Sequence, residues 1–197
     1  MSARPPRLVL ASTSPYRRAL LERLGLRFEV LNPAVEEAPL AGESPERLAL
    51  RLACAKAEGV ALADRETLVI GSDQVAALGG TVLGKPGTVA GARAQLAAAS
   101  GRSVVFYTAV ALARPGRSLA SHTDRTDVRF RTLSAAEIER YVARDQPLDC
   151  AASFRSEGLG IALLESIETG DPTALVGLPL IWLAAALKDA GLDPLLA

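Results

Sequence analysis

The amino-acid sequence predicts an α/β protein built on one mixed β-sheet that is flanked by helices. Three observations support this fold class. The chain has 197 residues, of which 49% are hydrophobic, so it can bury a sizeable core. Strand patterns alternate with helical patterns, and some strands are neighbours in the chain. No internal repeat, low-complexity tract or long linker interrupts this order, so we expect one domain over residues 1–197.

The first part of the chain alternates short strands with capped helices. Ser14-Pro15 and Ser44-Pro45 each supply an N-cap residue followed by a first-turn proline. The strand at residues 67–70 is expected to end in a polar loop, Gly71 to Gln74. We expect strands at residues 7–11, 28–31 and 67–70, and helices at residues 16–24 and 44–59.

The second part combines hairpins with two amphipathic helices. Gly79-Gly80 predicts a tight turn, and Ser134 with Glu137 forms a capping box. Residues 149–173 are expected to mix short strands with glycines. We expect a hairpin at residues 77–81, a loop at 84–87, strands at 103–113 and 123–132 about Pro115-Gly116, and helices at 89–99, 134–143 and 179–190.

The composition excludes several functional classes. A formal net charge of zero argues against a broad nucleic-acid-binding surface, although it allows a small basic pocket. Cys54 and Cys150 have neither metal-ligand spacing nor a disulfide framework, which favours a reducing compartment. The apolar run Leu8 to Ala11 is too short for a signal peptide or a membrane helix. We therefore expect a cytoplasmic protein with no membrane partner.

The single histidine, His122, restricts the chemistry further. It lies in the polar stretch SHTDRTD, so we expect it to be a solvated surface residue. One such histidine disfavours histidine-rich metal sites and Ser-His or Cys-His nucleophilic catalysis. Acid–base work then falls mainly on carboxylates, lysines and bound water.

Two motifs follow buried strands directly. Residues 12–18 (STSPYRR) join hydroxyls and arginines to the free N–H groups of a helix start, which is an arrangement that binds anions. Asp73, in residues 70–75 (IGSDQV), suits a divalent cation or a proton from water. The alternatives are an ordinary helix cap with solvated arginines, and a loop aspartate that makes an Asx-turn.

Three further motifs are weaker evidence for a functional site when each is taken alone. Lys85 between glycine and proline suits a phosphate contact, although an ordinary surface lysine is the more common explanation of such a residue. Glu36-Glu37 fits a solvated turn, and Lys56 lies in an alanine-rich helix, either partly buried or snorkelling. Glu157 between Ser156 and Gly158 could accept hydrogen bonds from a base edge, or be an exposed acid at a bulge. Together these groups favour metal-assisted phosphoryl chemistry over acyl transfer or redox chemistry.

Several of these motifs resemble one family when they are taken in order. The run LVLASTSPYRRALLERLG at residues 8–25 resembles the opening signature of the Maf family of nucleotide pyrophosphatases. The resemblance continues through Val35-Glu36-Glu37, Lys56, IGSDQV (70–75), GKP (84–86), CAASFRSEGLGI (150–161) and LVGLPL (175–180). It implies a Maf/ITPase-like mixed twisted sheet flanked by helices, with two lobes and an active-site cleft between them.

The resemblance also implies an activity and a set of roles. The activity is hydrolysis of a nucleotide substrate between the α- and β-phosphates, with Mg²⁺, Mn²⁺ or Co²⁺, in a cytoplasmic enzyme that is often a homodimer. The roles are phosphate contacts from Ser12, Arg17, Lys56 and Lys85, metal contacts from Glu37 and Asp73, catalysis by Asp73 with Lys56 and Lys85, and base selection by Tyr16, Gln74 and Glu157.

The three base-selecting positions indicate a branch of the family. The pyrimidine branch is characterised by the motifs Ser-Pro-Arg-Arg and Ser-Asp-Thr and by a later glutamine. At the third residue of each motif and at the glutamine position, this chain instead has Tyr16, Gln74 and Glu157. The residues present resemble the branch that hydrolyses 7-methyl-GTP to 7-methyl-GMP and pyrophosphate, a house-cleaning activity against modified nucleotides. Two alternatives stay open: a dTTP/UTP pyrophosphatase of the same family, and a non-enzymatic nucleotide-binding regulator of cell division.

Overall fold

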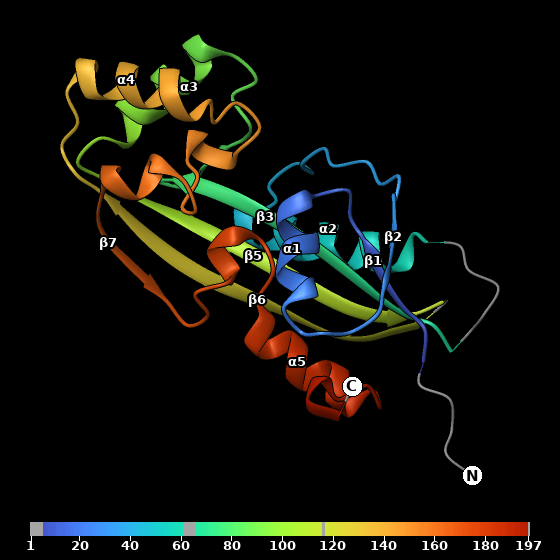
Figure 1. The fold of residues 1–197 in the computed structure, drawn as a ribbon. Coiled ribbons are helices and arrows are strands. Elements are labelled where there is room, and N and C mark those ends of the chain that lie inside the picture. Colours follow the sequence, from blue (N-terminus) through green and yellow to red (C-terminus); the bar gives the residue numbers. More distant parts are fainter. Residues whose placement is uncertain (1–5, 61–65, 116, 197) are drawn as a thin grey trace.

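One mixed β-sheet forms the centre of the protein. The computed structural model describes residues 6–60, 66–115 and 117–196, and Figure 1 shows how they are arranged. The strands are β1 (Leu8–Ala11), β2 (Glu29–Leu31), β3 (Leu68–Leu78), β4 (Thr81–Leu83), β5 (Ser103–Arg114), β6 (Arg117–Phe130) and β7 (Leu164–Thr169). Their order is β2-β1-β3-β5-β6-β7, with β4 paired to β3 beside this path. β1 pairs in parallel with β2 and β3, and the other pairings are antiparallel. The predicted fold class is confirmed.

Helices flank this sheet, and three of them begin at the N-caps that the sequence predicts, Ser14, Ser44 and Ser134. Ser14, Ser44, Thr88 and Ser134 each accept a backbone N–H from the first turn, and the Ser134–Glu137 capping box is formed. The helices of the described ranges are α1 (Pro15–Glu22), α2 (Pro45–Glu58), α3 (Val89–Ala99), α4 (Ala135–Asp145) and α5 (Leu180–Asp189). The short 3-10 helices are η1 (Ala151–Ser153), η2 (Leu159–Leu163), η3 (Ala174–Val176) and η4 (Pro194–Leu196).

The hydrophobic core is divided between two lobes. In Figure 1, α3 and α4 lie together at one end of the sheet, and α1, α2 and α5 lie toward the other. The α3–α4 lobe packs around Phe106, Phe130 and Phe154. In the other lobe, α1 and α5 pack against Leu8, Leu10, Ile70 and Leu112, while alanines and leucines of α2 pack against Val75, Ala109 and Ala111. β3 and β5 contribute residues to both lobes.

The prediction of a loop at residues 71–74 is wrong. β3 continues without interruption from Leu68 to Leu78, so Asp73 lies inside a long strand. Glycine and aspartate are poor strand formers. Here tertiary contacts outweigh that preference, because Gly71 packs against α2 and the Asp73 carboxylate has a cationic partner.

Two other expectations also need correction. Residues 149–173 hold one strand, β7, and the remainder forms η1, η2 and turns, with Ala152 and Ser153 at φ 55° and 56°. His122 lies in β6, is half-buried, and stacks on Trp182 with ring centroids 5.7 Å apart, so it is only partly exposed to solvent. The strands predicted about Pro115-Gly116 do form, but Gly116 itself lies outside the described residues.

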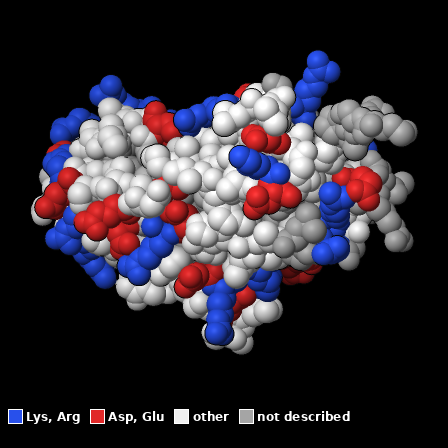
Figure 2. Space-filling model, turned by 90° about the horizontal axis from the view of Figure 1, so that it is seen from below, with Lys and Arg blue, Asp and Glu red and all other residues white. Residues whose placement is uncertain are grey.

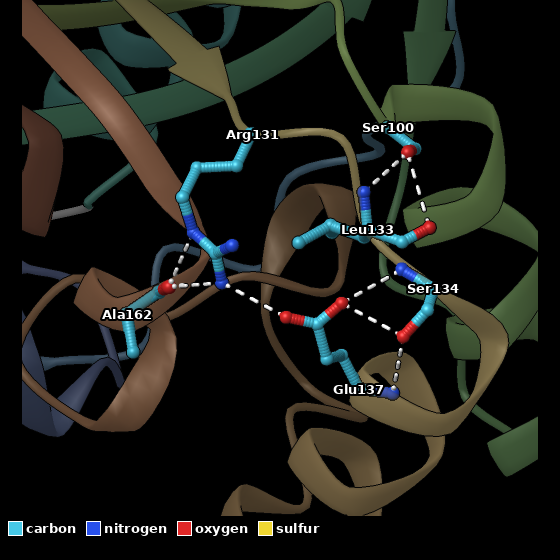
Figure 3. A network of polar contacts seen from close by, with 6 residues as sticks. All are labelled: Ser100, Arg131, Leu133, Ser134, Glu137 and Ala162. Atoms are coloured by element: carbon cyan, nitrogen blue, oxygen red, sulfur yellow. Dashed lines mark hydrogen bonds and ion pairs between the residues drawn. The ribbon is translucent and has the colours of Figure 1, made fainter.

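A polar network fastens α4 to the rest of its lobe (Figure 3). The Arg131 guanidinium donates to the Ala162 carbonyl at 2.9 and 3.0 Å and to Glu137 at 3.3 Å. Glu137 in turn accepts from the backbone and the hydroxyl of Ser134. Ser100 bonds both the N–H and the carbonyl of Leu133. These bonds join the start of α4 to η2 and to the end of α3.

The surface agrees with a chain of zero net charge. On the face shown in Figure 2, basic and acidic side chains lie side by side rather than in one basic patch. In the part of the chain that the structure describes, we find no helix with the length and apolarity needed to cross a bilayer.

Candidate active site

A cavity of about 590 Å³ opens beside a gap in the sheet. The pairing of β1 with β3 ends at Ala11 and Gly71, and the pairing of β4 begins at Ala76. Among the described strands, residues 72–75 of β3 therefore pair with β5 alone, which leaves their other edge open. Every site residue that the sequence predicts lines this cavity: Ser12, Tyr16, Arg17, Glu37, Lys56, Asp73, Gln74, Lys85 and Glu157.

Lys56 joins two carboxylates in the lining of the cavity. Its ammonium lies 2.7 Å from Asp73 Oδ1 and 2.5 Å from Glu37 Oε1. Lys56 and Asp73 are buried, whereas Glu37 comes from an exposed loop. Lys56 is thus a buried ion-pair partner rather than a snorkelling side chain, and Glu37 is not merely part of a solvated turn.

A glycine lets α2 approach β3 closely enough to form this cluster. A Cβ at Gly71 would lie 2.2 Å from the Ala53 carbonyl oxygen and 2.4 Å from the Ala57 nitrogen. Such contacts are far inside van der Waals distance, so a larger residue would push α2 away from the strand. The side chain of Lys56, one residue before Ala57, then reaches Asp73.

Burial and nearby charges shift the pKa values of Asp73 and Glu37 in opposite directions. Burial raises the pKa of Asp73, and the nearby charges of Lys56 and Arg17 only partly oppose it. Burial also acts to raise the pKa of Glu37, but the hydrogen bond and charge of Lys56 outweigh it and leave that pKa below its usual value. Asp73 is therefore the better proton acceptor of the pair.

The start of α1 presents cationic and hydroxyl groups to the same cavity. Arg17 Nε donates to the Gly177 carbonyl at 2.9 Å, and Nη1 lies 3.4 Å from Ser12 Oγ. Within the described residues, Arg17 Nη2 has no hydrogen-bond partner, so it can take an anion. Burial lowers the pKa of Arg17, with Asp73 and Glu37 opposing the shift.

Gln74 points to the opposite side of β3 from Asp73, as strand alternation requires. Its Nε2 lies 2.9 Å from Thr108 Oγ1, 3.1 Å from the Ala174 carbonyl and 3.0 Å from the Leu175 carbonyl. Carbonyl oxygens only accept, so these contacts fix which end of the amide is the nitrogen. The amide oxygen is the end of Gln74 left to accept a hydrogen bond from a ligand.

Tyr16, Arg155 and Glu157 line another part of the cavity. The Arg155 guanidinium is held by Asp145 at 2.7 Å and lies 3.5 Å from the Tyr16 hydroxyl. A Cβ at Gly158 would lie 2.8 Å from Asp145 Oδ1, so this glycine lets the backbone pass close to the Asp145 carboxylate. Glu157 is exposed, and its neighbour Ser156 donates to it at 2.7 Å.

Lys85 and Cys150 also line the cavity. Lys85 is exposed on the loop after β4, and its charge helps to lower the pKa of Glu37 across the cavity. Burial and the neighbouring Asp149 raise the pKa of the Cys150 thiol to about 12. A thiol with that pKa is not a nucleophile at neutral pH.

Sequence reasoning missed the groups that hold the predicted residues in place. The carbonyls of Ala174, Leu175 and Gly177 fix Gln74 and Arg17. Backbone carbonyls leave no side-chain signal in a sequence. The sequence signal that could have pointed to this segment is the short apolar stretch with Gly177. In the structure Gly177 has a φ of 125°, which few other residues adopt.

Comparison with known proteins gives consistent results. The sequence profile of the Maf-like protein family matches residues 7–190. The chain is 58% identical over 186 residues to a protein of Xanthomonas oryzae pv. oryzae named 7-methyl-GTP pyrophosphatase, covering 94% of this chain and 97% of that protein. It is 56% identical, with the same coverage, to a protein of that name from Xanthomonas campestris pv. campestris.

Among solved structures, a nucleoside-triphosphatase (dITP/XTP pyrophosphatase) from Mycobacterium abscessus aligns with a TM-score of 0.46 and 21% identity, covering 97% of this chain and 100% of that one. The family profile spans almost all of the described residues, and the curated relatives match over nearly their whole length. This chain belongs to the Maf family.

Proposed function

We propose that this protein hydrolyses 7-methyl-GTP to 7-methyl-GMP and pyrophosphate. The observation that carries the proposal is the gathering of the predicted phosphate-binding, acidic and base-selecting residues around one cavity of about 590 Å³. Such a volume suits a small-molecule ligand. The names of the Xanthomonas relatives support the same substrate.

The acidic residues fit a divalent cation that is shared with the substrate. Glu37 and Asp73 both direct an oxygen at one point, which Lys56 Nζ occupies. Among the described residues, no three His, Cys, Asp or Glu side chains gather as a complete metal cage. Magnesium is commonly held by one or two carboxylates together with substrate phosphates, so this donor set fits Mg²⁺, Mn²⁺ or Co²⁺. When bound, the ion would neutralise phosphate charge and polarise the α-phosphoryl group.

The chain's own residues supply the remaining steps. Asp73 accepts a proton from the water that attacks the α-phosphorus, and the raised pKa of Asp73 makes that transfer easier at neutral pH. The new bond joins water oxygen to the α-phosphorus, and the bond between that phosphorus and the bridging oxygen breaks. Arg17, Lys56 and Lys85 stabilise the negative charge on the departing pyrophosphate, and Ser12 contacts phosphate.

Tyr16 and Glu157 distinguish the base. N7-methylation makes guanine cationic, and an aromatic face attracts a cationic ring. Glu157 accepts hydrogen bonds from the guanine N1–H and amino group, which a pyrimidine does not reproduce. A charge-assisted bond of this kind contributes about 1.5–3 kcal/mol, which corresponds to a preference on the order of tens- to a hundredfold. The Gln74 amide oxygen offers a further acceptor.

Cellular location and assembly also belong to the proposal. Cys54 and Cys150 are free thiols, which supports work in the reducing cytoplasm. A single domain over residues 1–197 and a homodimer stay predictions. Gel filtration with light scattering measures whether the protein is a homodimer.

A pyrophosphate-release panel tests the proposed function. The substrates are 7-methyl-GTP, GTP, dTTP and UTP, each with Mg²⁺, Mn²⁺, Co²⁺ or EDTA. We expect the highest kcat/KM with 7-methyl-GTP and loss of turnover in EDTA. Higher kcat/KM with UTP or dTTP would select the pyrimidine alternative. Nucleotide binding in calorimetry without pyrophosphate release would select the non-enzymatic regulator.

A further inference from the structure

One short segment in the wall of the cavity contacts three polar side chains of β3 and α1 through its backbone carbonyls. Residues 170–179 connect β7 to α5 and include η3. The carbonyls of Ala174 and Leu175 accept from Gln74, at 3.1 and 3.0 Å. The Gly177 carbonyl accepts from Arg17 Nε at 2.9 Å, and it also lies 2.9 Å from the Ser72 hydroxyl, which contacts the Ala109 carbonyl at 2.7 Å. The directions of these carbonyls therefore set where Gln74 and Arg17 point.

Asp171 connects the beginning of this segment to the helix that follows it. The residue is 3% exposed. Its Oδ1 accepts from the Thr173 N–H at 2.8 Å and lies 2.6 Å from the Thr173 hydroxyl. Its Oδ2 accepts from the Ile181 N–H in the first turn of α5 at 2.7 Å. The two carboxylate oxygens thus join the beginning of the segment to the helix that follows it.

α5 depends on this contact because it has no local side-chain cap. Its N-cap residue is Pro179, which makes no side-chain hydrogen bond to the helix. Asp171 instead caps it from ten residues upstream, and the Thr173 hydroxyl accepts the Leu180 N–H at 2.9 Å. A carboxylate at a helix N-terminus is also favoured by the helix dipole. The segment is consequently fixed at both ends by one buried side chain.

We propose that Asp171 is a positioning residue for nucleotide binding, acting through the segment 173–177 on Arg17 and Gln74. Asparagine at this position replaces one acceptor oxygen with an NH₂ group, which then faces an N–H donor. One end of the segment loses its anchor, and the carbonyls of Ala174, Leu175 and Gly177 turn away from their present directions. Arg17 and Gln74 lose their fixed orientations without being changed themselves.

The test compares Asp171→Asn with Asp193→Asn, in the full chain. Asp193 is a matched control because it also accepts a backbone N–H, from Leu195 at 3.0 Å, near the other end of α5. Two readouts are used: the NMR resonances of the Arg17 Nε–H and the Gln74 side-chain amide, and KM and kcat for pyrophosphate release. Only the kinetic readout rests on the proposed function.

We expect Asp171→Asn to shift both resonances and to raise KM on the order of tenfold, the effect of about one lost hydrogen bond, with a smaller change in kcat. A purely structural role would lower the amount of active enzyme, and so apparent kcat, at unchanged KM. Resonances and KM matching those of Asp193→Asn would overturn the proposal. Shifted resonances in Asp171→Asn, together with a wild-type protein that releases no pyrophosphate from any nucleotide, would support the positioning role and refute the proposed function.

A second pair of variants applies if Asp171→Asn does not fold. Thr173→Val removes the hydroxyl that contacts Asp171 and accepts the Leu180 N–H, and Thr173→Ser restores it. We expect Thr173→Val to move the Arg17 and Gln74 resonances and Thr173→Ser to return them toward wild type. Unmoved resonances in folded Thr173→Val would overturn the proposal.

Discussion

Lys56 Nζ lies 2.7 Å from Asp73 Oδ1, so the most buried acid of the cavity is held in an ion pair. The pKa of Asp73 is nevertheless raised, because burial outweighs the attraction of Lys56 and Arg17. Replacement of Asp73 by asparagine should lower kcat by about 10²–10⁴, the usual contribution of a general base. Pyrophosphate release and circular dichroism measure turnover and folding. Turnover within about tenfold of wild type, a barrier change near 1.4 kcal/mol, would remove Asp73 from that role.

The same ion pair predicts a pH effect. Lys56→Met removes a charge that lowers the pKa of Asp73, so that pKa should rise further above its usual value. Since Asp73 must be ionised to accept a proton, the acidic limb of log kcat/KM against pH should move to higher pH. The plateau should also fall on the order of a hundredfold through loss of a phosphate contact. Lys188→Met, on the exposed side of α5, is the control and should leave the limb in place.

Glu157 should determine the preference between nucleotides. Glu157→Gln replaces a charged acceptor with a neutral one, so the ratio of kcat/KM for 7-methyl-GTP to that for UTP should fall by about tenfold or more. Glu165→Gln, an exposed change on β7, serves as control. An unchanged ratio would exclude Glu157 from base recognition.

Gly71 should be among the least replaceable residues of the sheet. Gly71→Ala places a Cβ within 2.4 Å of α2 backbone atoms, so α2 must shift and the protein should lose about 1–3 kcal/mol of unfolding free energy. Gly84→Ala, which meets nothing within 4 Å, should change stability by no more than about 0.5 kcal/mol. Urea unfolding measures both. Equal stability of the two variants would contradict the close approach of α2.

Glu137 predicts an acid dependence of stability. Its hydrogen bonds to Ser134 and Arg131 lower its pKa to about 2. A carboxylate with a depressed pKa stabilises the fold above its unfolded-state pKa, near 4.5, and that contribution disappears as pH falls toward 2. The stability difference between wild type and Glu137→Gln should therefore shrink between about pH 5 and pH 2. Glu139→Gln, on the same helix, controls for general charge effects, and urea unfolding at each pH supplies the measurement.

The sequence was informative where local signals agree with tertiary packing. Capping residues placed three helices because caps act within one turn. It was misleading at Gly71 and Asp73, whose strand conformation depends on α2 and Lys56, both distant in the chain. Likewise, the stacking of His122 on Trp182 joins residues 60 positions apart, which a local polar context does not reveal.

The site residues could be named from motifs, but the groups that orient them could not. Motifs consist of side chains that meet the ligand, so Arg17 and Gln74 were found. Their partners are main-chain carbonyls at residues 174–177, and the anchor of those carbonyls is Asp171. Orientation therefore emerges only from the folded arrangement.

The division of the core around shared strands has a consequence for folding. β3 and β5 supply buried residues to both lobes, so neither lobe retains a complete sheet once these strands detach. Loss of one lobe then removes the support of the other, and denaturant should unfold the whole chain in a single cooperative transition. Because Asp73 and Gln74 lie in the middle of β3, no half-folded form would keep a binding site. Nucleotide-binding capacity would thus serve as a direct count of fully folded molecules.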